Sequence, residues 1–291
     1  MKAEARVVAE ADGHGGTRLV VLRGQSPLLL RRTGPHRAAV PRAATGPTVH
    51  LIGGAAGPHP AAVPRTATGP TMHLIGGAAG PLRGDDLRLD IEVGPGAWLE
   101  ILSVAAQLAL PGRPAPASRM TITATVAAGG TLRWLPEPLI AAAGCDHIAV
   151  TRVTVEAGGS LLWRDDLVCG RHGEDPGDVI ADTLFGYAGS TLHRHELAVG
   201  PRAPGWNAAA VLGPHRAIGT LLLAGPAAAV PNLTVPHSPG PSPTVAAAAI
   251  MPLAGPGVLA TAVAPDIRAV RAALDPLCAL RPTPCASPGW P

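Results

Sequence analysis

The sequence predicts a mostly β protein in which layered antiparallel strands stack into a flattened body resembling a β-helix. Polar and apolar residues alternate along Leu87–Val93 and nearly so along Met120–Val126, which is the pattern of half-buried strands. A glycine turn flanked by valine and leucine recurs at intervals of roughly thirty residues. A helical pattern lies near the C-terminus. The 291 residues suffice for one domain, 1–291, with a buried core.

The recurring turns share the pattern Val-x-x-Gly-x-x-Leu. They lie at Val93–Leu99, Val126–Leu132 and Val155–Leu161, and a looser copy lies at Gly186–Leu192. We expect a positive φ angle at the central glycines, because a tight reversal of the chain favours that conformation. Those glycines are Gly96, Gly129 and Gly158. Each turn would then join two strands of a hairpin.

The N-terminal third contains a near-verbatim duplication. Residues 17–30 read as two short strands around a turn, and the segment Pro35–Gly57 then recurs as Pro58–Gly80 with three differences. Two such copies, rich in proline and glycine, indicate a recent insertion within 35–80 rather than a solenoid, whose repeats diverge. We expect the first copy to be extruded as a loop.

The C-terminal half predicts further strands and one helix. Thr191–Val199 and Gly219–Ala224 are the expected strands. Pro265–Leu274 is the best helix, since its apolar residues recur at helical spacing and Asp266 lies in its first turn. Pro276 should end or kink this helix. The proline-rich tail, 281–291, is expected to fray.

Composition excludes several classes of function. The net charge is +3, and no arginine run is interleaved with aromatic residues, which argues against nucleic-acid binding. The first residues lack the apolar core of a secretory signal, and Pro241–Pro265 is too broken by proline to span a membrane. Four cysteines without a CxxC pair indicate reduced thiols. We therefore predict a cytoplasmic protein, with a mean hydropathy of +0.25 that favours poor solubility without a partner.

Catalytic signals are absent from the sequence, and we predict that the protein is not an enzyme. No nucleophile elbow of the Gly-x-Ser-x-Gly type occurs. Asp165 and Asp166 would point to opposite faces of a strand, so we interpret them as solvent charges rather than an acid and base pair.

Scattered polar side chains are the candidate metal ligands. His193 and His195 are interpreted as exposed strand residues, and Cys145 and Cys169 as buried small apolar side chains. Arg171 is expected to pair with Glu174. Partial sites of this kind suit a carrier, because a complete thiolate or imidazole shell would hold a late divalent metal too tightly for release. The weak candidates for transient metal contact are His73, Glu137, Cys145, His147, His172 and Glu174.

Several short motifs, in a fixed order, resemble the urease accessory protein family UreD, called UreH in some species. The clearest are Leu132–Ile140, with Glu137 between two prolines, and Gly170–Glu174 about thirty residues later. In the family, a single strand of this sequence leads directly into a Gly-Asp turn, and here only the second copy of the duplication continues in that way, through Pro81 to Asp85. We therefore expect His73, which lies in the second copy, to hold the native register of that strand. The similarity runs from about Leu22 to about Gly219.

This resemblance implies a mostly β fold with about two helices, one near the C-terminus. It also implies a non-enzymatic chaperone that acts with UreF and the GTPase UreG, in an accessory complex that forms a dimer, to insert nickel into apo-urease. Nickel would pass through in transit and no cofactor would be bound permanently. Two departures from the family pattern are the duplication and the small residues Ala141–Ala143.

Two other classes of function remain open. A β-rich module that binds a small molecule or a polysaccharide would need an aromatic groove, which a chain with one Phe and one Tyr supports poorly. A metal-dependent hydrolase would require His193, His195 and a carboxylate to converge on a tightly bound ion.

Overall fold

The computed structural model describes residues 1–34, 69–226 and 247–278, which form stacked strands and a single helix. The elements are β1 (Lys2–Ala11), β2 (Thr17–Gly24), β3 (Leu28–Gly34), β4 (Thr71–Gly76), β5 (Asp86–Val93), β6 (Trp98–Ser103), β7 (Gln107–Ala109), β8 (Ser118–Val126), β9 (Thr131–Leu135), β10 (Leu139–Ala141), β11 (Asp146–Val155), β12 (Ser160–Val168), β13 (Asp178–Tyr187), β14 (Ser190–Val199), β15 (Ala217–Ala224), β16 (Ala247–Pro252), β17 (Gly257–Ala264) and α1 (Ile267–Cys278). The prediction of a mostly β, stacked fold with a helix near the C-terminus is confirmed. In the described part of the chain α1 is the one helix, where about two were expected.

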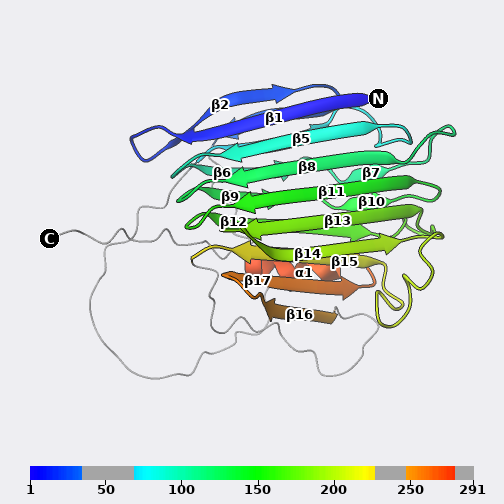
Figure 1. The fold of residues 1–291 in the computed structure, drawn as a ribbon. Coiled ribbons are helices and arrows are strands. Elements are labelled where there is room, and N and C mark those ends of the chain that lie inside the picture. Colours follow the sequence, from blue (N-terminus) through cyan, green and yellow to red (C-terminus); the bar gives the residue numbers. More distant parts are fainter. Residues whose placement is uncertain (35–68, 227–246, 279–291) are drawn as a thin grey trace, which may run out of the picture.

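Two sheets face each other across the core. Sheet A has the strand order β14-β13-β11-β8-β5-β1-β2, and sheet B has the order β16-β17-β15-β12-β9-β6-β4-β3, with β7 and β10 joined beside this path. Figure 1 views the stack from the side of sheet A, whose strands follow one another from β2 at the top to β14. Sheet B extends past β14 to β17 and β16, near α1. The body is therefore a two-sheet solenoid.

The antiparallel direction predicted for the stacked strands is wrong for the centre of both sheets. β5, β8, β11 and β13 pair in parallel in sheet A, as do β4, β6, β9 and β12 in sheet B. The reason lies in the glycine turns, which carry the chain from one sheet to the other. Each strand therefore meets its neighbour one full turn of the solenoid later, running in the same direction.

The three glycine turns stack on one another as arches between the sheets. Their glycines have positive φ angles of 67°, 71° and 84° at Gly96, Gly129 and Gly158, as predicted. Backbone hydrogen bonds continue the strand ladders into the turns, from Ala127 N to Val93 O at 2.9 Å and from Glu156 N to Val126 O at 2.9 Å. The hydrogen-bonded ladders of the stacked strands therefore continue through the turns.

The looser fourth turn is a true hairpin. Tyr187 and Ser190 pair across a loop of two residues, Ala188 and Gly189, whose φ angles are 50° and 81°. Two central residues with positive φ match the hairpin turn whose twist suits antiparallel strands. β13 and β14 are antiparallel for this reason, and the parallel run of sheet A ends there.

Gly130 provides a test of the stacked arches. A Cβ atom at this position would lie 2.9 Å from Ala127 O and 2.9 Å from Gly94 O, which are backbone atoms that cannot swing away. We expect Gly130→Ala to lower the free energy of unfolding by about 1–3 kcal/mol, the usual cost of overpacking. Gly76→Ala is the control, because its Cβ would meet nothing closer than Ala78 O at 3.8 Å. Equal urea midpoints for the two variants would contradict the arch geometry.

The core follows from the alternation of apolar residues. Along β5, Leu87, Leu89, Ile91 and Val93 are all buried, while the residues between them face outward. The second copy of the duplication supplies β4, which pairs with β3 and β6, and its Met72 is fully buried. The first copy and the tail 281–291 lie outside the described residues.

Helix α1 covers the outer face of sheet B over β15 and β17. Val270 and Leu274 are buried against the sheet, as their helical spacing predicts. Asp266 lies just before the helix, and its carboxylate accepts a hydrogen bond from Ala269 N at 3.0 Å, which caps the N-terminus. That bond is the main cause of a pKa below the ordinary value for Asp266. Pro276 does not end the helix, which continues to Cys278.

Candidate functional site

A cavity of about 320 Å³ lies between the sheets. It reaches from the β3 and β4 region, at Leu28 and Leu74, across the interior to β14, at His193 and His195. Aromatic and aliphatic side chains supply most of its wall. Those most relevant here are Met120, Ile122, Trp134, Trp163, Phe185 and Leu222.

Asp165 is one of four acidic residues in the cavity lining, with Asp85, Glu137 and Asp166. It follows Trp163 by two residues on β12, so both side chains face the space between the sheets. Burial raises the pKa of Asp165 to about 7, against the effect of the Trp163 indole N–H, which donates to its Oδ2 at 2.8 Å. The Trp134 indole N–H lies near the same carboxylate and also favours its ionised form, although it meets no acceptor at hydrogen-bonding geometry.

An aromatic row leads from the buried wall to the edge of sheet A. Trp134 stacks on Trp163 with ring centroids 5.0 Å apart, and Trp163 meets Phe185 edge-on at 5.8 Å. Phe185 stacks on His193 at 6.2 Å, and His193 stacks on His195 at 6.0 Å. Burial, followed by the neighbouring His195, lowers the pKa of His193. The row ends at an exposed side chain, because His195 is open to solvent.

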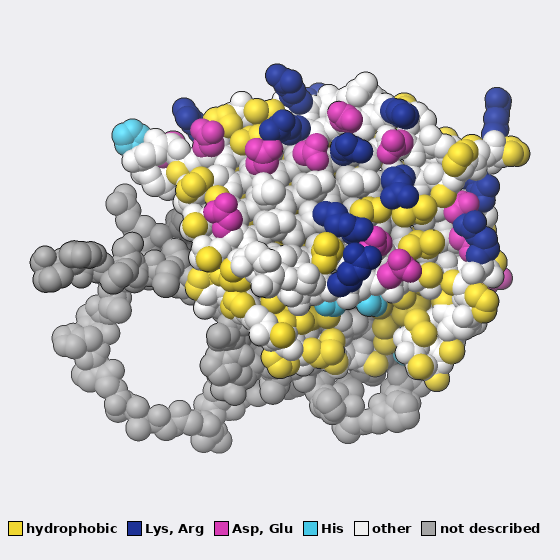
Figure 2. All heavy atoms as spheres, viewed as in Figure 1, with side chains coloured by type: hydrophobic (Ala, Val, Ile, Leu, Met, Phe, Trp, Pro, Cys, Tyr) yellow, Lys and Arg dark blue, Asp and Glu magenta, His cyan; other side chains and the backbone are white. Residues whose placement is uncertain are grey.

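Figure 2 shows the outside of sheet A. Acidic and basic side chains mix over its upper part. One ion pair between β1 and β5 joins Arg6 and Glu92 at 2.6 Å. Hydrophobic side chains gather toward the lower edge, where Figure 1 places β14 to β17. Histidine side chains appear at the border between these two regions. The cavity approaches the surface at β14, where the lining residue His195 is exposed.

Sheet B has a break in its ladder that places Glu137 beside the cavity. β12 is continuous, but it pairs with β9 over its first residues and with β10 over its last. Pro136 and Pro138 cannot donate to a strand ladder, so the chain leaves the sheet between them. The Glu137 backbone N–H donates instead to Ser103 Oγ at 2.8 Å, and Glu137 lines the cavity.

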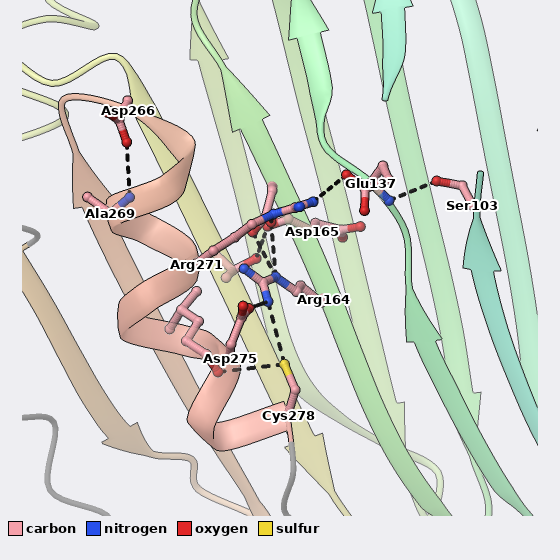
Figure 3. Close-up of polar contacts among 12 residues, drawn as sticks. Ser103, Glu137, Arg164, Asp165, Asp266, Ala269, Arg271, Asp275 and Cys278 are labelled. Carbon is pink, nitrogen blue, oxygen red and sulfur yellow. Dashed lines mark hydrogen bonds and ion pairs between the residues drawn. The ribbon is translucent and has the colours of Figure 1, made fainter. Parts of the chain in front are cut away.

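A charged cluster holds α1 against this break (Figure 3). Arg271 Nη2 donates to Glu137 Oε2 at 2.6 Å, and Arg271 Nε lies 4.0 Å from Asp166 Oδ2. Arg164 forms the centre: its Nε contacts both oxygens of Asp166, at 3.1 and 3.0 Å, and its Nη1 donates to Asp275. Burial raises the pKa of Asp166, although Arg164 acts in the opposite direction. These ion pairs therefore connect α1 to residues of the cavity wall.

Comparison with known proteins identifies the family. The model of the UreD urease accessory protein family matches residues 1–289. Urease accessory protein UreD 3 of Streptomyces griseus is 40% identical over 281 residues, which cover 94% of this chain and 95% of the relative. UreD of Streptomyces avermitilis is 37% identical over 277 residues, covering 94% and 95%, and UreD of Frankia alni is 40% identical over 305 residues, covering 95% and 92%.

This chain belongs to the UreD family of urease accessory proteins. The predicted resemblance, from about Leu22 to about Gly219, is confirmed, and the family match extends beyond it on both sides, over residues 1–289. These relatives are named as accessory proteins rather than as enzymes. Among the residues that the UreD structure describes, no helix has the length and apolar character needed to cross a membrane.

The six predicted metal-contact residues do not meet in this UreD chain. Within the described ranges, no three His, Cys, Asp or Glu side chains lie where they could hold one ion. His73 is on β4, with Nδ1 at 2.9 Å from Thr33 Oγ1. His172 is exposed, and Glu174 accepts from Arg171 Nε at 2.8 Å in the same turn, so the expected pair forms. Glu137 is the one of the six that lines the cavity.

Cys145 and His147 are sealed in the interior. Burial raises the pKa of the Cys145 thiol to about 11, and Cys169 behaves alike, so both remain protonated, as expected of small buried side chains. Burial lowers the pKa of His147 to about 4, which keeps its ring neutral. His147 Nδ1 lies 2.9 Å from Ser118 Oγ, and its Nε2 has no partner among the described residues.

Two interpretations of polar residues require correction. Asp165 and Asp166 alternate along β12, but neither is a solvent charge, because both contribute to the cavity wall and Asp166 is also paired with Arg164 beneath α1. His193 and His195 share one strand face and both line the cavity; His195 is exposed as predicted, whereas His193 is half-buried. The alternation of Leu161, Trp163 and Leu167 already places Asp165 on the core face, so the sequence contained a signal for it.

Asp165 should make stability fall as pH rises. An unfolded aspartate titrates near pH 3.9, whereas Asp165 keeps its proton up to about pH 7 in the folded state. Between these values the unfolded chain binds fewer protons, so the free energy of unfolding decreases, and it stays lower above pH 7. Asp165→Asn mimics the protonated form. We expect the free energy of unfolding of Asp165→Asn, measured by urea denaturation, to exceed that of the wild type by an amount that grows from about pH 5 to pH 8. A difference that stays constant over this range would contradict the raised pKa of Asp165.

Proposed function

We propose that this chain is a urease maturation factor that scaffolds the delivery of nickel to apo-urease and has no catalytic activity of its own. Membership of the UreD family over essentially the whole chain is the observation that carries the proposal. We further propose that its partners are UreF, the GTPase UreG and the apo-urease subunits, in a dimeric accessory complex in the cytoplasm. The two-sheet solenoid supports such a role, because it offers long, regular faces to protein partners.

Nickel is proposed as cargo in transit. The candidate contacts His73, Glu137, Cys145, His147, His172 and Glu174 are spread through the fold. A single carboxylate or imidazole binds a late divalent ion weakly enough to release it, which is what delivery requires. Glu137 is the strongest of the six, since it combines a place on the cavity wall with partial exposure.

Co-purification tests the partners. The tagged chain is expressed with UreF, UreG and the urease subunits, and each partner is then omitted in turn. We expect the chain to elute with UreF and UreG in size-exclusion chromatography and to retain apo-urease when all components are present. A chain that elutes alone under every combination would contradict the proposed scaffold.

Glu137→Gln tests the cargo contact. We expect this variant to lower urease activation severalfold, measured as nickel content and activity of the purified urease, because the neutral amide is a poorer ligand. Arg271→Gln is the matched control: it breaks the same 2.6 Å ion pair but leaves the carboxylate in place. If both variants lower activation equally, the ion pair matters and the carboxylate is not a nickel contact.

A further inference from the structure

β4 occupies a place in sheet B between β3 and β6, which we call the β4 slot. It pairs antiparallel with β3 and parallel with β6. Met72 on its inner side is fully buried, and Leu74, two residues later, packs against the same core. β3 lies at the edge of the sheet and joins the ladder through β4. A strand in this slot is therefore needed to complete sheet B and to cover the core.

The β4 slot is demanding at both of its ends. Before β4, a Cβ atom at Gly69 would overlap the backbone carbonyl of Trp98. After β4, Gly80 has a φ angle of 135°, and a Cβ atom there would lie 2.9 Å from Leu82 N. Side chains other than glycine are strained in that conformation. A segment fits the slot only if glycine stands at these two positions on either side of the strand.

The first copy of the duplication meets these requirements. Residues 46–58 read Gly-Pro-Thr-Val-His-Leu-Ile-Gly-Gly-Ala-Ala-Gly-Pro, and residues 69–81 read Gly-Pro-Thr-Met-His-Leu-Ile-Gly-Gly-Ala-Ala-Gly-Pro. The one difference is Val49 in the place of Met72. Both side chains are apolar, but valine is smaller and would fill the buried position less completely. The β4 slot is therefore matched by two segments of one chain and favours the second.

The connections on either side permit an exchange of the two copies. Gly34, at the end of β3, pairs with Thr71. With the first copy in the slot, the connection from β3 would shorten to residues 35–47, and residues 59–81 would form a second loop before Leu82. Leu82 is 38% exposed, so the chain is at the surface where this loop would leave. Closing a second loop costs entropy, which together with the smaller valine makes this the minor arrangement.

We propose that the β4 slot is a binding site for either copy of the duplication, and that the first copy replaces the second within one molecule when the second cannot enter. The exchange is intramolecular, because a short connection to β3 gives the first copy a high effective concentration at the slot. The duplication thus supplies a spare strand for sheet B. This inference concerns the choice of strand and does not depend on urease maturation.

A charged substitution at the buried position tests the exchange. Met72→Asp would bury a carboxylate and so exclude the second copy from the slot. We expect the full chain with Met72→Asp to stay folded, and hydrogen–deuterium exchange to show protection of 71–76 in the wild type and of 48–53 in the variant. Val49→Asp should leave the protection of 71–76 unchanged. Met120→Asp is the matched control: Met120 is buried in the same core and has no second copy, so the cooperative urea transition should be lost.

Two further variants separate the exchange from simple tolerance of a charge. The double variant Val49→Asp with Met72→Asp, and Met72→Asp in a chain without Pro35–Gly57, leave no intact copy, so both should lose the cooperative transition. A folded protein in either case would overturn the inference, as would unfolding of the full chain by Met72→Asp alone. Size-exclusion chromatography of Met72→Asp gives the last criterion. A monomer supports exchange within one molecule, whereas a dimer, in which one molecule fills the slot of another, contradicts it.

Discussion

Arg164→Ala is expected to lower the free energy of unfolding by about 3–5 kcal/mol, the usual cost of breaking a buried ion pair from one side. The side chain of Asp166 is 1% exposed, so after the substitution its charge would remain in the interior without the two contacts from Arg164 Nε. Asp275 of α1 would lose its partner at the same time. We expect a lower urea midpoint and faster proteolysis near α1.

Arg194→Ala is the control for this effect. Arg194 is 54% exposed and lies 3.3 Å from Asp182, so its ion pair is solvated and should contribute about 0–1 kcal/mol. A second variant separates charge from packing: Arg164→Met combined with Asp166→Leu removes both charges and should recover part of the loss. A midpoint for Arg164→Ala equal to that of Arg194→Ala would show that the cluster does not hold α1.

Trp163→Ala is expected to lower the free energy of unfolding by about 3–5 kcal/mol, the range for truncating a large buried aromatic side chain. Trp163 is 1% exposed, stacks on Trp134 and lies beside a cavity that the truncation would enlarge. The substitution also removes the N–H donor to Asp165. Urea denaturation measures the loss.

Trp163→Phe separates packing from the hydrogen bond. It keeps most of the apolar contact, so its stability should lie between those of the wild type and Trp163→Ala. Without the indole donor, the pKa of Asp165 should rise further above its folded value of about 7, because that bond favours the ionised form. NMR titration of the Asp165 carboxyl measures this change. An unchanged pKa would contradict the role of Trp163 in the cavity.

The local structure was largely predictable from the residues. Alternation along Leu87–Val93 predicts which side chains of β5 are buried, and the glycine turns predict the positive φ angles at Gly96, Gly129 and Gly158. Strand direction was not predictable, because Val-x-x-Gly-x-x-Leu fits a hairpin and an arch equally well. The choice depends on whether the next strand joins the same sheet, which is a long-range property.

The candidate site was harder to predict for the same reason. Arg164 and Asp275 are separated by 111 residues, so no local pattern indicates their contact. The position of Asp165 on the core face can be read from its neighbours, but its burial depends on sheet A covering β12. The individual metal candidates were chosen from residue type and from resemblance, and the fold separates them.

The most direct test of the proposed maturation role is urease activity in nickel-supplied cells that carry urease and the other accessory genes, with this chain supplied or omitted. A second arm supplies a variant without Pro35–Gly57, so that an effect of the duplication is distinguished from a lack of function. Membership of the UreD family predicts activity when the chain is supplied and little when it is omitted. Activity that is the same with the chain, with the variant and with neither would contradict the maturation role.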